Sequence, residues 1–207
     1  MESIHLHPSR RFVLRSLAAL TTVVIAAAVA TPAQAQPDGP WPTRPITWVV
    51  PFTPGGSTDV IGRTIGQKLA DVLKQPVVVD NKPGAAGAVG AAFVAKSKPD
   101  GYTLFGGTIS THAINASLYK NLSYDPVKDF EPITLVASLP NVLIVSPSLG
   151  VNNVAELIAL LKKDSSKRQF ASSGAGTSAH LAGELLGDLI GVQLTHIPYK
   201  GTPPALL

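Results

Sequence analysis

The chain has 207 residues, 45% hydrophobic and 14% charged, with 18 glycines and 18 prolines, which predicts one large or two small globular, turn-rich domains. It has no cysteine, so disulfides, thiolate chemistry and a lipoprotein anchor are excluded. The net charge of +4 falls to +2 without residues 1–35, which hold three of the 17 basic and one of the 13 acidic residues, and so small a charge argues against nucleic acid as a partner.

The N terminus reads as an export signal. Three arginines precede an apolar run, Leu17–Ala30, that is too short to span a bilayer comfortably. Ala33–Ala35 has the A-x-A form of a cleavage site, so we predict a signal peptide over residues 1–35, cleaved near Ala35. The stretch Ser9–Leu14 resembles a twin-arginine signal with its Phe-Leu pair displaced, so twin-arginine and Sec export both remain open. Either route indicates a bacterial periplasm, and a membrane anchor is the weaker alternative.

A strand, a glycine turn and a helix come next in the chain. Ile46–Phe52 is a short run rich in β-branched and aromatic residues, typical of a buried strand. Pro54–Gly56 ends it, and Ser57 or Thr58 is predicted to be the N-cap of the following helix. Asp59 then falls in the first turn of this helix. The glycines leave backbone N–H groups bare at the positive end of the helix dipole, a place that can hold an anion.

Further alternation of strands and helices follows. Val77–Asp80 is predicted to be a second strand, Asn81–Gly87 a loop and Gly87–Ser97 a helix with a face of small residues. Pro99–Gly101 is a strong turn signal, and Tyr102–Gly107 reads as a third strand. Alternation at this spacing predicts βαβ units with a parallel sheet.

The middle of the chain has weaker signals. Asn115–Lys120 is predicted to form a helical turn, and Tyr124–Phe130 a polar surface loop. Ile133–Ser146 is a long apolar stretch interrupted at Pro140, which predicts two strand segments that cross between two lobes.

The last third repeats the alternation. Val154–Lys163 and Ser178–Ile190 are predicted to be helices, and Gln169–Ser173 and Gln193–Tyr199 strands. Gly201–Leu207 reads as the start of one more helix.

Three loops share one position in this scheme, each after the carboxyl end of a strand: Pro54–Thr58, Gly106–Thr111 and Gly174–Thr177. In open α/β sheets this edge is where ligands bind. Their glycines expose backbone N–H groups and their hydroxyls suit direct or water-mediated contacts. The candidate ligand-binding residues are Gly55, Gly56, Ser57, Thr58, Asp59, Thr108, Ser110, Thr111, Gly174, Gly176 and Thr177.

Each loop also has a plainer interpretation. The first is equally a helix cap without a ligand, and the second a solvated turn. Asp59 would repel a ligand carboxylate, so we expect it to cap its helix or to accept from an amino group or a bridging water.

Rival motifs are incomplete. Gly174–Ala179 fits the dinucleotide fingerprint G-x-G-x-x-G/A, but no acidic residue ends the next strand. Ser117 begins an S-x-x-K pattern without its companion motifs. A periplasmic serine hydrolase using Ser57 or Ser117 is the alternative from another class, although neither serine has a histidine in a recognisable motif. The histidines lack metal-ligand spacing, so neither a metal nor a cofactor is expected.

Six segments resemble the tripartite tricarboxylate transporter receptors, the Bug-type family of periplasmic solute-binding proteins. This resemblance implies a two-lobe (Venus flytrap) α/β fold with parallel-rich sheets flanked by helices, and the three loops lining the cleft. It implies a receptor without enzymatic activity that captures small carboxylates, such as di- and tricarboxylates or amino acids, and hands them to a membrane permease. The segments are Val50–Asp59, Val77–Gly87, Lys98–Leu104, Tyr124–Phe130, Gly174–Glu184 and Pro198–Gly201.

The resemblance also bears on the domains. Family members continue for about a hundred residues past the segment matching Pro198–Gly201, in line with ordinary domain sizes. We therefore expect a C-terminally truncated chain, with part of lobe 1 over 36–137 and part of lobe 2 over 138–207. A fragment that neither folds nor binds is the corresponding alternative.

Overall fold

Strand β1 (Ile46–Val50) is the central strand of the first sheet. The computed structural model describes residues 40–207, so the predicted signal peptide lies outside the described residues. β1 pairs in parallel with β2 (Val77–Asn81) on one side and with β3 (Thr103–Phe105) on the other. Val49 and Val50 are fully buried, because the strand is covered on both faces.

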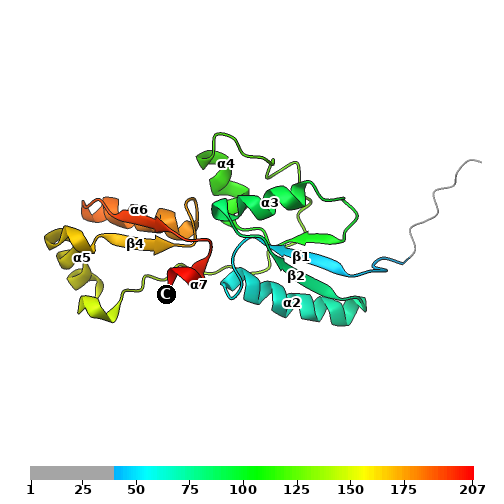
Figure 1. Cartoon of the computed structure of the whole chain (residues 1–207), viewed down its shortest axis with the longest axis horizontal. Coiled ribbons are helices and arrows are strands. Elements are labelled where there is room, and N and C mark those ends of the chain that lie inside the picture. Colours follow the sequence, from blue (N-terminus) through cyan, green and yellow to red (C-terminus); the bar gives the residue numbers. More distant parts are fainter. Residues whose placement is uncertain (1–39) are drawn as a thin grey trace, which may run out of the picture. The chain divides into compact units, whose positions relative to one another are not determined.

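Helices α2 (Ser57–Leu73) and α3 (Ala88–Ala95) flank this sheet (Figure 1). α2 packs on β1 and β2, and α3 on β1 and β3. Two glycines bring α2 close to the strands: a Cβ on Gly62 would lie 3.2 Å from Val50 Cγ2, and one on Gly66 3.2 Å from Val77 Cγ1. The face of α2 toward the sheet therefore includes small residues.

A second sheet holds β4 (Gln169–Ser172) and β5 (Thr195–Pro198), again parallel. Helix α6 (Ser178–Ile190) connects the two strands and packs on both. The remaining helical segments are α4 (Asn115–Leu118), α5 (Val154–Lys163), α7 (Thr202–Ala205), a π-helical turn at Ser110–Ile114 and 3-10 turns at Ala85–Gly87, Pro147–Leu149 and Ser165–Lys167.

The predicted α/β class with parallel strands is confirmed, and each predicted helix of the last third lies where it was expected. α5 and α6 have the predicted bounds because both carry side-chain N-caps: Asn153 accepts from the Glu156 N–H, and Thr177 from the His180 N–H. Four of the five strands are one to three residues shorter than predicted, and β2 is one residue longer.

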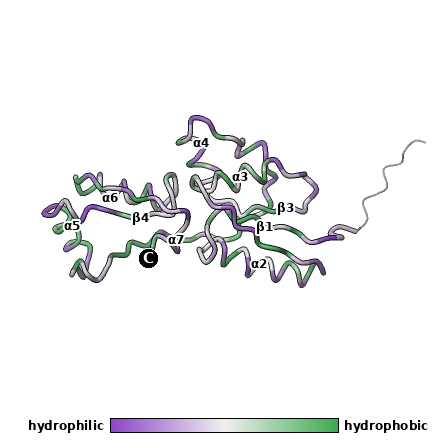
Figure 2. The backbone as a smooth tube through the Cα atoms, in the orientation of Figure 1, coloured by the Kyte–Doolittle hydropathy of each residue, from purple (hydrophilic) through white to green (hydrophobic). Residues whose placement is uncertain are grey.

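The two strands predicted within Ile133–Ser146 are wrong. This stretch forms neither helix nor strand, and every residue from Glu131 to Ser148 is exposed. A strand needs a neighbour to accept its backbone hydrogen bonds, and no strand of residues 40–207 lies beside this one. Figure 2 shows it as apolar coil before α5.

Tyr124–Phe130 was predicted to be a polar surface loop, and this prediction is only partly right. Tyr124 is buried, and the Phe130 ring packs against Phe105, His112 and Tyr124 at centroid distances of 5.7, 4.9 and 5.9 Å. Only the residues between are polar and solvated, because Asp125 accepts from the N–H groups that follow it. The two aromatic ends anchor the loop under β3.

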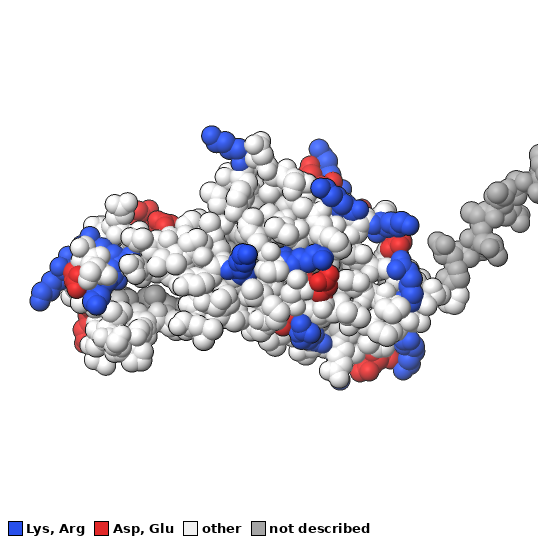
Figure 3. Space-filling view, in the orientation of Figure 1, with Lys and Arg blue, Asp and Glu red and all other residues white. Residues whose placement is uncertain are grey.

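Basic and acidic side chains are mixed on the surface. Figure 3 shows Lys and Arg interspersed with Asp and Glu on the visible face, and most of that face carries neither. Within residues 40–207, no helix has the length and apolar character needed to cross a membrane.

Candidate functional site

The turn between β1 and α2 contains two glycines and leads directly into the first turn of the helix. Gly55 has φ +81°, a conformation that favours glycine. The N-cap is Gly56, which offers no side-chain acceptor, so the predicted N-cap role of Ser57 or Thr58 is wrong. Ser57 is instead the first helical residue. The N–H groups of the first turn therefore have no side-chain cap within the described chain, so no capping side chain offsets the positive end of the helix dipole there.

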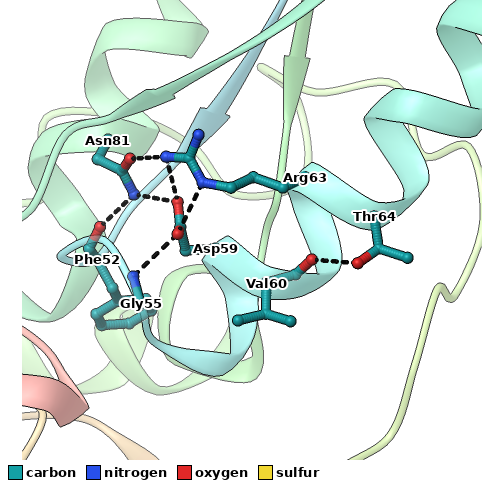
Figure 4. A network of polar contacts seen from close by, with 7 residues as sticks. All are labelled: Phe52, Gly55, Asp59, Val60, Arg63, Thr64 and Asn81. Atoms are coloured by element: carbon teal, nitrogen blue, oxygen red, sulfur yellow. Dashed lines mark hydrogen bonds and ion pairs between the residues drawn. The ribbon is translucent and has the colours of Figure 1, made fainter.

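Asp59 lies in the first turn of α2, and its side chain packs beneath the glycine turn that precedes the helix. Its carboxylate is 3% exposed and accepts from the Gly55 N–H at 2.9 Å, from Arg63 Nε and Nη2 at 2.9 and 3.0 Å, and from Asn81 Nδ2 at 2.9 Å (Figure 4). Asn81 also donates to the Phe52 carbonyl, at 3.0 Å. Asp59 therefore ties the glycine turn, the helix and the end of β2 together, and its charge is compensated by Arg63.

The same contacts set the protonation of Asp59. The Arg63 hydrogen bond, with those from Gly55 and Asn81, lowers the pKa of Asp59 from 3.8 to about 2, although burial acts in the opposite direction. The unfolded chain therefore binds this proton more readily than the folded chain does. The resulting stabilisation is complete above about pH 4 and is lost as the pH falls toward 2.

We predict that this acid sensitivity disappears in Asp59→Asn. The free energy of unfolding of the parent chain should fall by about 2 kcal/mol more than that of the variant between about pH 6 and pH 2.5. Urea unfolding at the two pH values measures this difference. A gap between the two proteins that stays constant with pH would contradict it, because the other carboxylates titrate equally in both.

The loop after β3 is held by its own side chains. The Thr111 hydroxyl accepts from the Thr108 N–H at 2.9 Å, donates to the Thr108 carbonyl at 3.0 Å and lies 2.9 Å from His112 Nδ1. Ser110 and Thr111 are buried and begin a π-helical turn, so this loop is not the solvated turn of the plainer interpretation. Of the three predicted residues, only Thr108 is partly exposed.

The end of the predicted loop Asn81–Gly87, which was not among the three predicted ligand-binding loops, lies against this one. Gly84–Gly87 has positive φ at all four residues, including Ala85 at +46° and Ala86 at +50°. Such values cost a residue with a Cβ about 1–2 kcal/mol each. Two alanines carry no sequence signal for this conformation, and the only available clue was the pair of flanking glycines.

The Gly174–Thr177 turn precedes α6. Gly174 has φ +141° and Gly176 +92°. The Gly174 N–H donates to Ser172 Oγ at 3.1 Å, the Gly176 N–H to His180 Nδ1 at 3.2 Å and the Thr177 N–H to the Gly174 carbonyl at 3.1 Å. These amides are thus already paired, which leaves the first turn of α6 as the source of open N–H groups here.

Two of the three predicted loops meet at Gly84–Gly87. A Cβ on Gly87 would lie 2.7 Å from Thr111 Cγ2, and one on Gly176 3.6 Å from Ala86 Cβ. The first loop lies next to α7 instead, because a Cβ on Gly55 would lie 3.7 Å from Pro203 Cγ. No hydrogen bond among the described residues joins Gly55–Asp59 to either of the other two predicted loops.

Asn115 is a further residue that the sequence did not indicate. It is fully buried, and its Nδ2 donates to the Ala86 carbonyl at 3.3 Å and to Tyr124 Oη at 3.5 Å. Its Oδ1 has no hydrogen-bond partner among the described residues, and a Cβ on Gly176 would lie 3.1 Å from it. Thr53 Oγ1 and Thr108 Oγ1 are likewise buried without a partner, so unpaired polar atoms gather around the predicted loops.

Two surface hollows among residues 40–207 are lined by none of the predicted site residues. One, of about 280 Å³, lies at the C-terminal end of α6, and the other, of about 190 Å³, lies between Val145 and the start of α5. The described residues contain no group of three or more His, Asp or Glu side chains placed to hold a metal ion.

The hydrolase alternative requires a histidine beside a serine. Among residues 40–207, neither Ser57 nor Ser117 forms a hydrogen bond to a histidine. Ser172 does, to His196 Nε2 at 2.6 Å, but Ser172 is 2% exposed and its hydroxyl also contacts the Gly174 carbonyl at 3.1 Å. A nucleophile must be reachable by its substrate, and this one is not.

Comparison with known proteins identifies the family. Residues 61–207 match the family described as "Tripartite tricarboxylate transporter family receptor". The chain is 39% identical over 194 residues to protein BugT of Bordetella pertussis, covering 93% of this chain and 59% of BugT. It is 40% identical over 166 residues to a UPF0065 protein of Pseudomonas sp. (strain P51), covering 80% of this chain and 49% of that one. The chain thus spans about half the length of these relatives.

Solved structures agree with this match. An R. palustris protein solved with adipate is 42% identical, with a TM-score of 0.78 over 80% of this chain and 56% of that one. MatC from Rhodopseudomonas palustris, with bound malate, is 35% identical, with a TM-score of 0.74 over the same shares. The parallel sheets, the loops at their carboxyl ends and these matches together show that the chain belongs to the tripartite tricarboxylate transporter receptor family, as its sequence motifs indicated.

Proposed function

We propose that this chain belongs to a periplasmic solute-binding receptor that captures a small carboxylate, a di- or tricarboxylate or an amino acid, without chemically changing it. The permease of a tripartite tricarboxylate transporter is the proposed partner that receives the ligand. The family match and the two relatives solved with adipate and malate support this proposal. The eleven residues predicted from the three loops remain the proposed ligand contacts.

The observation that carries the proposal is the uncapped start of α2. Gly56 provides no side-chain acceptor, so the N–H groups of Ser57 and Thr58 are available to a carboxylate. Asp59 does not cancel this attraction, because its charge is matched by Arg63 at 2.9 Å. The repulsion expected from the sequence is thereby removed, and the helix end favours an anion.

Calorimetric titration with adipate and with malate tests the proposal, with Ser57→Pro and Ser57→Ala as a matched pair. Proline suits the first position of a helix and removes the N–H together with the hydroxyl, whereas alanine removes the hydroxyl alone. Gly56, at φ −77° and ψ 170°, already has the conformation favoured before proline. We expect Ser57→Pro to weaken binding at least about tenfold, the worth of one hydrogen bond to a charged group. Ser57→Ala should bind like the parent.

Three results would overturn the proposal. One is the absence of saturable binding to any of a panel of small carboxylates by a chain that unfolds in one sharp transition. A second is equal affinity of Ser57→Pro and the parent. The third is turnover of a simple ester, which would favour the hydrolase.

A further inference from the structure

Two histidines stack beside the Gly174–Thr177 turn. His196, on β5, packs against both Phe170 of β4 and His180 of α6, with ring centroid distances of 4.9 Å to Phe170 and 4.0 Å to His180, and the Phe170 and His180 rings are 6.4 Å apart. Phe170 and His196 are register partners in the parallel pair. A Cβ on Gly183 would overlap the Phe170 ring, so the glycine allows α6 to lie directly on this stack.

Both histidines are connected to the turn by hydrogen bonds. His180 Nδ1 accepts from the Gly176 N–H at 3.2 Å. His196 Nε2 lies 2.6 Å from Ser172 Oγ, and that hydroxyl accepts from the Gly174 N–H and contacts the Gly174 carbonyl, both at 3.1 Å. The two glycines with positive φ in this turn are therefore held by the two histidines, one directly and one through Ser172.

The bond to Gly176 determines which nitrogen of His180 carries the proton. Because Nδ1 accepts, the proton of neutral His180 is on Nε2, which lies 3.5 Å from Glu184 Oε1. A second proton can be added only at Nδ1. Protonated Nδ1 is a donor, so it can no longer accept from the Gly176 N–H.

The groups that face His180 are few. His196 faces it from β5 and Glu184 from its own helix. Tyr119, which directly follows α4, donates to the Ala175 carbonyl of the turn at 3.0 Å. Phe170, from β4, carries no charge. Burial and the neighbouring His180 lower the pKa of His196, although Glu184 acts in the opposite direction. Two protonated rings 4.0 Å apart repel each other.

We propose that His180 is a positioning residue for the Gly174–Thr177 turn, and that adding a proton to its Nδ1 releases Gly176 and weakens ligand binding. This inference rests on the proposed function, in which that turn contacts the ligand. A turn with two positive-φ glycines has much conformational freedom to lose, so a ligand meeting the released turn must also order it. The site is thereby sensitive to pH in the range where imidazoles titrate.

Two substitutions at His180 separate its roles. Asn places its Oδ1 near the position of His Nδ1, so His180→Asn keeps an acceptor for Gly176 that cannot be protonated. Gln places its polar atoms near the position of His Nε2, so His180→Gln does not keep an acceptor for the Gly176 N–H. Between about pH 8 and pH 5, we expect the affinity of the parent for malate to fall. This fall should be about five- to tenfold larger than any fall in His180→Asn. At pH 8, His180→Asn should bind like the parent, and His180→Gln about five- to tenfold more weakly.

Comparison with His180→Asn removes the contribution of malate, since malate titrates alike with both proteins. A pH profile that is the same in the parent and in His180→Asn overturns the inference, and so does tighter binding by the parent at pH 5 than at pH 8. If His180→Gln does not fold, the parent and His180→Asn alone decide the question.

An NMR measurement without ligand keeps this test independent of the proposed function. The amide resonance of Gly176 in ¹⁵N-labelled chain should shift between pH 8 and pH 5 together with the His180 ring nitrogens, and should not shift in His180→Asn. If malate and adipate do not bind but the Gly176 resonance shifts as expected, the proposed function fails while the positioning role stands. A Gly176 resonance that does not change with pH in the parent overturns the positioning role.

Discussion

Replacement of Asp59 with alanine should lower the free energy of unfolding by about 3 kcal/mol. The buried carboxylate accepts four hydrogen bonds, from Gly55, Asn81 and both contacting nitrogens of Arg63. Its removal takes away the acceptor of two partly buried hydrogen bonds, from the Gly55 N–H and the Asn81 amide, while Arg63, which is half exposed, can turn toward water.

Asp71→Ala is the matched control, because Asp71 lies exposed on the same helix. It should change stability by less than about 0.5 kcal/mol. Urea unfolding of both variants at neutral pH measures the difference between them. If the two variants lose equal stability, Asp59 does not hold the turn, the helix and β2 together.

Gly87→Ala should cost about 2–4 kcal/mol, for two separate reasons. The residue has φ +88°, which disfavours any side chain, and the new Cβ would lie 2.7 Å from Thr111 Cγ2 and 3.0 Å from Pro51 Cβ. Pro51 follows directly on the central strand and cannot yield easily. Thr111 can move, but its hydroxyl holds the loop after β3, so we expect this variant to disturb the Thr108–Thr111 contacts as well.

Gly150→Ala separates the two reasons. Gly150 also has positive φ, +64°, but no atom lies within 4 Å of the position its Cβ would take. It should therefore cost about 1 kcal/mol, the conformational part alone. Thermal or urea unfolding of the two variants gives the crowding contribution as their difference. Equal losses would mean that the contact between Gly87 and Thr111 is loose.

Local signals were sufficient to predict much of this fold. α6 has a hydroxyl N-cap at Thr177 and a glycine C-cap at Gly191, so its bounds can be read from neighbouring residues alone. The parallel arrangement also follows from the spacing of strands and helices. By contrast, the apolar stretch 133–146 has strand-like residues, but whether it forms a strand depends on a neighbour that no local pattern specifies.

The candidate site shows the same limit. Arg63 stands four residues after Asp59, so that contact was accessible from helical spacing, whereas Asn81, 22 residues from Asp59, was not. Ala85 and Ala86 adopt backbone angles that alanine rarely takes, so residue type pointed away from the observed conformation. The Ser172–His196 contact joins two strands and likewise had no sequence signal.

The ion pair between Asp59 and Arg63 in the first turns of α2 has a consequence for engineering this site. Because Asp59 and Arg63 neutralise each other without help from the neighbouring exposed hydroxyl residue, Ser57, libraries that vary this position and Thr58 leave the local charge balance intact. Altered ligand preference can then be selected one uncharged substitution at a time, without a compensating second change elsewhere in the scaffold.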